Sequence, residues 1–179
     1  NNATTQIAPE VKEAMEPYLG DSYANPSSLY ESGQLARRRI EEARENIARF
    51  LGVRGRELIF TSGGTESNNT ALCSALKCFP LKKKIVTTQV EHSSIKNLCD
   101  ALTKEGYHIH LIGVSENGAL DWDDFMGSLD SDVAIVSIMW ANNETGVLFP
   151  IREIGEELKS RKILFHVDAV QAVGKIPIW

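Results

Sequence analysis

The chain has 179 residues, of which 42% are hydrophobic and 24% charged, and its formal net charge is -5. This balance is typical of one ordinary globular domain, and the lack of a long basic run disfavours a nucleic-acid partner. No apolar stretch is long enough to cross a membrane and no signal pattern opens the chain, so a cytoplasmic protein is expected. Cys73, Cys78 and Cys99 lack paired spacing and predict neither disulfides nor a metal site.

Helical and strand-like patterns alternate along the chain. A helix over about 9–19 begins at Pro9, and another over about 28–51 carries one apolar stripe that ends at Gly52. Strands are predicted at 58–62, 85–89, 107–114, 133–139 and 163–169, with helices at about 65–78, 93–105, 121–129 and 151–161. Several strands are apolar almost throughout, as in sheets that are covered on both faces. The pattern predicts an α/β fold with three layers, α/β/α, around a mostly parallel sheet.

Four polar clusters follow predicted strands: "SGGTESNN", "VEHSS", "WANNETG" and "HVDAVQ". Ligands of open α/β sheets bind beyond the carboxyl ends of the strands, so the four clusters are expected to share one pocket. In the first cluster, Gly63 and Gly64 are expected to adopt positive φ where a helix begins near Thr65. The N–H groups and dipole of that helix suit a phosphate monoester. The same letters also serve plain turn and N-cap chemistry, and neither common nucleotide motif is present.

The other clusters supply groups with two interpretations each. Asp168 either makes a structural cap or ion pair or stays ionised beside a protonated ring nitrogen, with Gln171 donating to a ring oxygen. His92 is either structural or stacks on a flat cofactor and moves protons. Asn142 and Asn143 either stabilise a turn or offer amide groups to a ligand. Taken together, a phosphate cradle, a stacking ring, a carboxylate and amides match the needs of pyridoxal 5'-phosphate (PLP).

The segments "NNATT", "NPSS", "FTSGGTESNN", "EH", "ANNETG" and "HVDAVQAVGKIPI" follow the order and approximate spacing of NifS-type cysteine desulfurases. The whole chain resembles this branch of the class V aminotransferase group. The resemblance implies the large domain of a PLP-dependent transferase of fold type I, in a homodimer with the active site near the subunit interface. It also implies that residues 1–25 form an N-terminal segment lining the active-site mouth and that 26–179 form part of the PLP-binding domain.

The resemblance further implies a role for each matching residue. Gly64 and Thr65 would hold the phosphate, and His92 would stack on the pyridine and assist catalytic proton transfer. Asp168 would pair with the ring nitrogen, and Gln171 would reach the phenolic oxygen. The substrate would be bound by residues of the N-terminal loop and by the amide that also contacts the cofactor: Asn2, Ala3, Thr4 and Asn143. The implied reaction removes sulfur from L-cysteine, leaving alanine and a persulfide for an iron–sulfur scaffold or another acceptor protein.

One departure from the family is serious. The family's Schiff-base lysine lies in an "SGHK" motif beyond "DAVQ", and its acceptor cysteine lies further on; neither motif occurs in these residues. Lys175 lies in a segment that has no catalytic duty in the family. The chain is therefore expected to be an inactive portion of the enzyme, with an unpaired sheet edge. The alternatives are a selenocysteine lyase or another class V enzyme, and a non-catalytic fragment that dimerises or binds phosphate.

Overall fold

The computed structural model describes residues 2–178, which form two compact units. The N-terminal unit comprises residues 3–60, and the sheet unit comprises residue 2 together with residues 61–178. The boundary expected from the sequence, between residues 25 and 26, stays a prediction about domains. No helix within residues 2–178 is both long and apolar enough to span a membrane.

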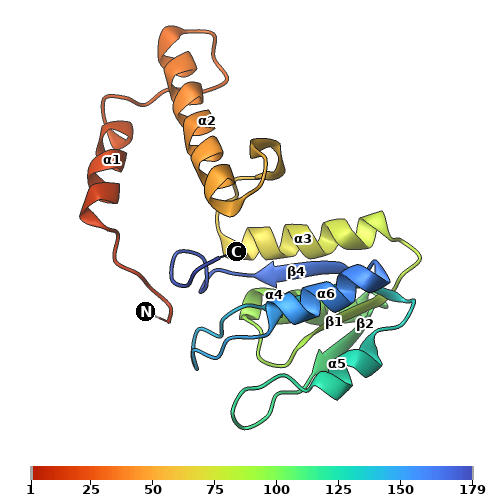
Figure 1. Ribbon diagram of the computed structural model, residues 1–179. Coiled ribbons are helices and arrows are strands. Elements are labelled where there is room, and N and C mark those ends of the chain that lie inside the picture. The colour runs from red at the N-terminus through yellow and green to blue at the C-terminus, as the bar shows by residue number, and fades with distance from the viewer. Residues whose placement is uncertain (1, 179) are drawn as a thin grey trace. The chain divides into compact units, whose positions relative to one another are not determined.

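The N-terminal unit consists of helices α1 (Pro9–Leu19) and α2 (Glu31–Leu51) and the short 3-10 helix η1 (Gly55–Glu57) (Figure 1). Both predicted helices are confirmed, although α2 begins later than residue 28. The Asn25 side chain accepts a hydrogen bond from the Ser27 N–H (2.9 Å), and this turn delays the helix. Gly52 ends α2 as predicted, with φ 69°, a left-handed conformation that glycine adopts without strain.

The predicted strand at 58–62 is wrong. These residues pair with no strand in the described part of the chain, although the backbone at Leu58 is extended. The Leu58 carbonyl instead accepts a hydrogen bond from the Arg44 guanidinium (2.8 Å), which also lies 4.7 Å from the centre of the Phe60 ring. An apolar run becomes a strand only where a neighbouring backbone supplies hydrogen bonds, and local sequence does not encode that neighbour.

The sheet unit contains four parallel strands in the order β2-β1-β3-β4. The strands are β1 (Lys84–Thr88), β2 (His108–Ile112), β3 (Val133–Met139) and β4 (Leu164–Asp168). Helix α3 (Gly64–Cys78) precedes β1, and the helices that connect successive strands are α4 (Ser93–Lys104), α5 (Trp122–Ser128) and α6 (Ile151–Arg161). Each strand is linked to the next through a helix, as parallel pairing requires. The predicted α/β fold with a parallel sheet is confirmed.

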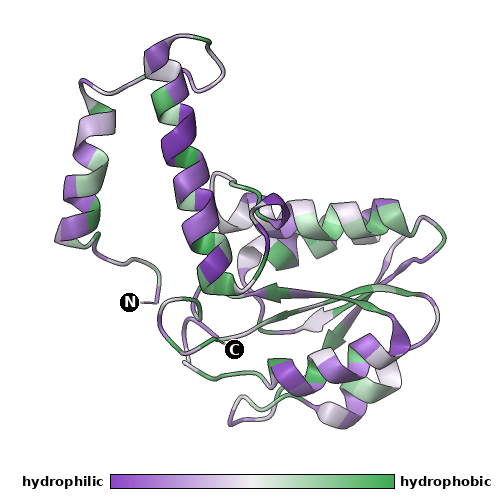
Figure 2. Ribbon diagram, turned by 45° about the horizontal axis from the view of Figure 1, so that its top comes forward, coloured by the Kyte–Doolittle hydropathy of each residue, from purple (hydrophilic) through white to green (hydrophobic). Residues whose placement is uncertain are grey.

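The two faces of the sheet are covered by different helix pairs (Figure 1). On one face, Ile85 and Ile135 pack with buried residues of α3 and α4. On the other face, Val86 and Val136 pack with Phe125 of α5 and with residues of α6. Every residue of β3 is buried, and all of them except Ser137 are apolar, as in a strand that is covered on both faces. Much of the sheet has hydrophobic colouring in Figure 2. Two-sided burial therefore fixes β3 at the centre of the core.

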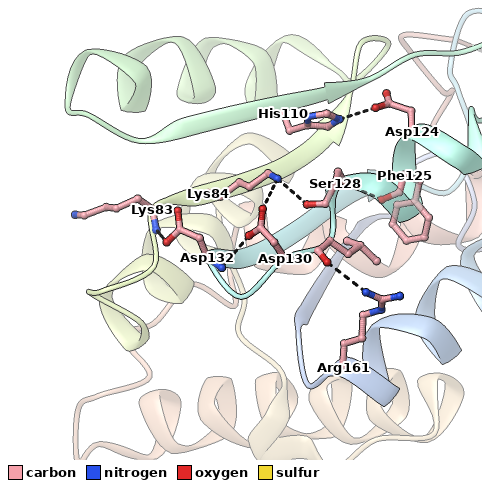
Figure 3. A network of polar contacts seen from close by, with 10 residues as sticks. Lys83, Lys84, His110, Asp124, Phe125, Ser128, Asp130, Asp132 and Arg161 are labelled. Carbon is pink, nitrogen blue, oxygen red and sulfur yellow. Dashed lines mark hydrogen bonds and ion pairs between the residues drawn. The ribbon is translucent and has the colours of Figure 1, made fainter.

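The amino ends of β1 and β3 are fastened by long basic side chains, in what we term the amino-end rim (Figure 3). Lys84 donates to the Ser128 carbonyl (2.7 Å) and to the Asp130 carboxylate (2.8 Å). Arg161 donates to the Leu129 carbonyl (3.2 Å). These bonds tie the segment that precedes β3 to β1 and α6. The basic run at residues 82–84 thus has a structural explanation.

Candidate functional site at the carboxyl-end rim

Three strands end side by side, and each is followed at once by a polar cluster. Strands β1, β3 and β4 end at Thr88, Met139 and Asp168, and their carboxyl ends share one edge of the sheet because all three run parallel. We term this edge the carboxyl-end rim. It is the place where open α/β sheets bind ligands.

A chain of hydrogen bonds joins two of the predicted site residues. The Asn68 amide nitrogen, on α3, donates to the Asp168 carboxylate (2.8 Å) and to the Ser94 hydroxyl (2.9 Å). That hydroxyl lies 2.9 Å from His92 Nδ1. Asn68 and Ser94 are both buried, so water does not compete for these bonds. The structure thereby brings Asp168 and His92 into one network.

His92 caps the amino end of α4, and this fixes its tautomer. Its Nδ1 accepts a hydrogen bond from the Ser94 backbone N–H (3.2 Å). A backbone N–H can only donate, so Nδ1 is an acceptor and the proton of the neutral ring sits on Nε2. The Ser94 hydroxyl, which accepts from Asn68, can in turn donate to Nδ1. His92 is exposed, and its Nε2–H is directed to neither of these partners.

Asp168 is half-buried and is held by neutral donors. One carboxylate oxygen accepts from the Asn68 amide, and the other accepts from the Val170 backbone N–H (3.1 Å). Among residues 2–178 it forms no ion pair. Its negative charge is thus positioned but not neutralised, which suits a cationic partner.

The glycines before α3 have a different role from the one expected. The helix begins at Gly64, close to the predicted start, but the positive φ expected at Gly63 and Gly64 is wrong. Gly63 is extended (φ 161°, ψ 179°), and Gly64 is not among the glycines with positive φ. A Cβ atom on Gly64 would lie 3.1 Å from Val170 Cγ2. Gly64 therefore lets α3 begin in close contact with the segment that follows β4, and a larger residue there would require the Val170 side chain to shift.

The first turn of α3 still offers N–H groups that have no partner within the helix. A carboxylate already lies at this turn: Glu66 accepts from both the backbone N–H and the hydroxyl of Ser62 (2.7 Å each). These hydrogen bonds, the hydroxyl's first, lower the pKa of Glu66, so it is an anion at neutral pH. The phosphate-binding role of Gly64 and Thr65 stays a prediction.

The two neighbouring asparagines divide their tasks. Asn142 is nearly buried, and its side-chain oxygen accepts from the N–H groups of Glu144 and Thr145 (3.0 Å each), so its turn-stabilising interpretation is confirmed. Both asparagines line a groove of about 510 Å³ together with His92, and Asn143 is the one whose side chain is not used by the turn. Thr65, Asp168 and Gln171 do not line this groove.

Gln171 is already engaged in the sheet unit. Its amide nitrogen donates to the Asn2 carbonyl (3.1 Å), and its amide oxygen accepts from the Lys175 ammonium. Asn2 therefore lies beside the segment that follows β4. Ala3 and Thr4 belong to the N-terminal unit, and their proposed contact with substrate stays a prediction.

Sequence reasoning missed Asn68, Ser94 and Glu91 as members of this site. A signal existed for Asn68, since it shares the buried face of α3 with Leu72 and Ala75, where an amide is out of place. Ser94 stood within the quoted cluster "VEHSS" without being assigned a role. Glu91 stood there too, and its burial could not be read from the sequence.

A parallel sheet covered by helices, with a carboxylate and a histidine joined at its carboxyl edge, defines an open α/β protein with a candidate ligand site at that edge. The chain belongs to the class-V aminotransferase family, whose model, described as "Aminotransferase class-V", matches residues 1–179. This confirms the resemblance noted from the sequence.

Relatives named as cysteine desulfurases are similar to nearly the whole of this chain. A cysteine desulfurase of Trichormus azollae is 50% identical over 99% of this chain and 44% of its own length. Cysteine desulfurase NifS of Azotobacter vinelandii is 47% identical, again over 99% of this chain and 44% of its length. A solved structure titled NifS-like protein superposes with a TM-score of 0.95 at 36% identity, covering 99% of this chain and 50% of that one. The chain thus spans less than half the length of the curated relatives it matches.

Proposed function

We propose that the protein containing this chain is a PLP-dependent cysteine desulfurase, which takes sulfur from L-cysteine and leaves alanine. The relatives named above carry that activity in their names. The observation that carries the proposal is the chain of hydrogen bonds from Asp168 through Asn68 and Ser94 to His92. It supplies a charged group and an aromatic ring, held at fixed positions, to one ligand.

The residues present fit PLP by their donor chemistry. Asp168 carries a negative charge held only by neutral donors, which suits the protonated nitrogen of a pyridine ring. When bound, the cofactor supplies an electron-withdrawing ring that stabilises negative charge developing on an attached amino acid. Asp168 would keep that ring protonated, and Asn68 would keep the carboxylate in place.

His92 would stack on the ring and handle a proton at Nε2. With Nδ1 occupied by the cap of α4, the imidazole is oriented by its own helix and only Nε2 is left to exchange a proton with substrate. Gly64 and Thr65 would anchor the phosphate at the first turn of α3. Gln171 would reach the phenolic oxygen by exchanging its present bond to Asn2.

The remaining assignments concern substrate and partners. Asn143, in the groove beside His92, would bind the substrate carboxylate, with the loop Asn2, Ala3 and Thr4 at the mouth. The protein would act as a cytoplasmic homodimer and pass sulfur to an iron–sulfur scaffold or another acceptor protein. These assignments follow the family resemblance and extend the named activity of the relatives.

The test uses the protein containing this chain, supplied with PLP. Release of sulfide and alanine from L-cysteine, with a thiol reductant present, is expected together with cofactor absorbance. The variant Asp168→Asn should lose most of this activity and should bind the cofactor more weakly, and Asp130→Asn at the opposite rim should match the parent in both. A protein that takes up no PLP would contradict the proposal, and one that acts on L-selenocysteine but not on L-cysteine would favour a selenocysteine lyase.

A further inference from the structure

Glu91 is a buried carboxyl group placed between two strand ends, directly before His92. It is 3% exposed, and its Oε1 accepts from the Thr88 hydroxyl (2.7 Å) and from the Met139 backbone N–H (3.0 Å). Thr88 is the last residue of β1 and Met139 is the last residue of β3. One side chain therefore links the ends of both strands at the carboxyl-end rim.

The groups that line the groove continue from these two strand ends. The Asn142 amide nitrogen donates to the Val90 carbonyl (3.2 Å), so the turn after β3 is also tied to the segment after β1. His92 follows Glu91 on one side and Asn143 follows Asn142 on the other, and both line the groove. The position of Glu91 thus sets the separation of the two groove walls.

The second oxygen of Glu91 points to a protonated acid. Oε2 is buried and has no hydrogen-bond partner within residues 2–178. A buried anion with one bare oxygen is costly, whereas a neutral acid has only its proton to satisfy. Burial raises the pKa of Glu91 to about 7, and the negative charge of Asp168 acts in the same direction. The hydrogen bonds from Thr88 and Met139, and the charge of Lys96, act in the opposite direction but are outweighed.

We propose that Glu91 is a positioning residue of this site, a neutral acid that braces β1 against β3 so that His92 and Asn143 face one groove. Ionisation strengthens the two hydrogen bonds to Oε1 but leaves a buried charge whose Oε2 has no donor within residues 2–178. That oxygen then draws in water or moves toward it, and the shift of the side chain displaces the groove walls. The negative charge formed on Glu91 interacts with the charges of Asp168, on β4, and Lys96, on α4. This role of Glu91 depends on the proposed function only in that PLP and L-cysteine are taken as the ligands of the groove.

The test follows nuclear magnetic resonance signals of the full chain without ligand from pH 5 to 9. The carboxyl carbon of Glu91 reports its protonation, the Met139 amide reports the brace, and the side-chain amide of Asn143 reports the groove. All three are expected to shift together with a midpoint near pH 7. In Glu91→Gln, which keeps the acceptor but cannot ionise, the Met139 and Asn143 signals should stay constant. The control Glu105→Gln removes an exposed carboxylate from the end of α4 and should behave as the parent.

Each other outcome decides against the inference. If the Glu91 carboxyl group is already ionised at pH 6, the proposal that Glu91 is a neutral acid is overturned. An Asn143 signal that ignores the ionisation of Glu91 would overturn its positioning role, because a merely structural acid would move only Met139. Titration with PLP, monitored by absorbance, separates the two proposals. If the protein containing this chain binds no PLP, the proposed function is contradicted. The nuclear magnetic resonance signals recorded without ligand would still decide whether Glu91 positions the groove.

Discussion

The two rims of the sheet use polar side chains in opposite ways. At the amino-end rim, Lys84 and Arg161 donate hydrogen bonds to carbonyl and carboxylate groups of the segment that precedes β3 (Figure 3). At the carboxyl-end rim, Asp168 has no ion pair and Glu91 Oε2 has no hydrogen-bond partner among residues 2–178. Satisfied groups add stability, whereas groups with unused capacity can bind a ligand. Both rims are polar, so polarity does not tell them apart. The carboxyl-end rim differs because some of its polar groups still have capacity to form hydrogen bonds or ion pairs.

The largest expected effect tests whether the carboxyl-end rim lowers stability. An unfolded glutamate ionises near its ordinary pKa of 4.5, but folded Glu91 keeps its proton to about pH 7. The folded state binds more protons in this window, so its stability falls as pH rises from 4.5 to 7 and then levels off. The loss is about 3 kcal/mol in the free energy of unfolding.

Urea unfolding of the parent and of Glu91→Gln, at steps between pH 4 and 8, measures this loss. The difference between the two proteins should change across the window, while Glu105→Gln tracks the parent. A difference that is constant with pH would mean that Glu91 ionises normally and that the contrast between the rims is smaller than described.

The next effect concerns the ligand and separates charge from stacking. Asp168→Ala should weaken PLP binding by about 10- to 100-fold, the worth of a charge-assisted hydrogen bond. His92→Ala should weaken it by about 2- to 10-fold, the worth of an aromatic stack. Equilibrium titration of the protein with PLP provides both constants. Equal effects would contradict the view that the unneutralised charge of Asp168 dominates this rim.

The amino-end rim should respond in stability alone. Lys84→Met removes two hydrogen bonds and leaves the Ser128 carbonyl without its donor, so the free energy of unfolding should fall by about 1–2 kcal/mol. PLP affinity should stay constant. The matched control is Lys83→Met, whose ammonium lies over the Tyr107 ring (4.6 Å), with a loss below about 1 kcal/mol. A Lys84→Met protein with normal stability but weaker PLP binding would reverse the assignment of the rims.

The smallest effect is the acid response of the amino-end rim. The hydrogen bond from Lys84 lowers the pKa of Asp130, so its contribution is present above the ordinary pKa of 3.8 and is lost as pH falls below it. Asp130 is exposed, and solvent screening limits the contribution to about 0.5 kcal/mol. Thermal unfolding of Asp130→Asn should differ from the parent at pH 7 and match it near pH 3. If the difference in stability between Asp130→Asn and the parent grows as pH falls, the stabilising role of ionised Asp130 is contradicted.

Much of the fold could be predicted because its signals are local. Gly52 marks the end of α2, and the run from Val133 to Met139, apolar except for Ser137, indicates a strand covered on both faces. The run at 58–62 is also rich in apolar residues, but the strand predicted there is wrong, because its backbone pairs with no strand within residues 2–178. A strand needs a neighbouring strand to pair with, and the sequence does not show which segments become neighbours in the sheet.

The sequence by itself determined the alternation of strands and helices, the collection of polar clusters at strand ends, and the candidates His92, Asn143 and Asp168. These follow from periodicity and from the shared edge of parallel strands. Only the tertiary structure decided that Asn68 joins Asp168 to Ser94, that Asn142 serves a turn, and that Glu91 is buried with one oxygen unmet. The reason is physical: the burial and hydrogen-bond partner of a polar group depend on chain segments that lie far away in sequence and meet only when the sheet forms.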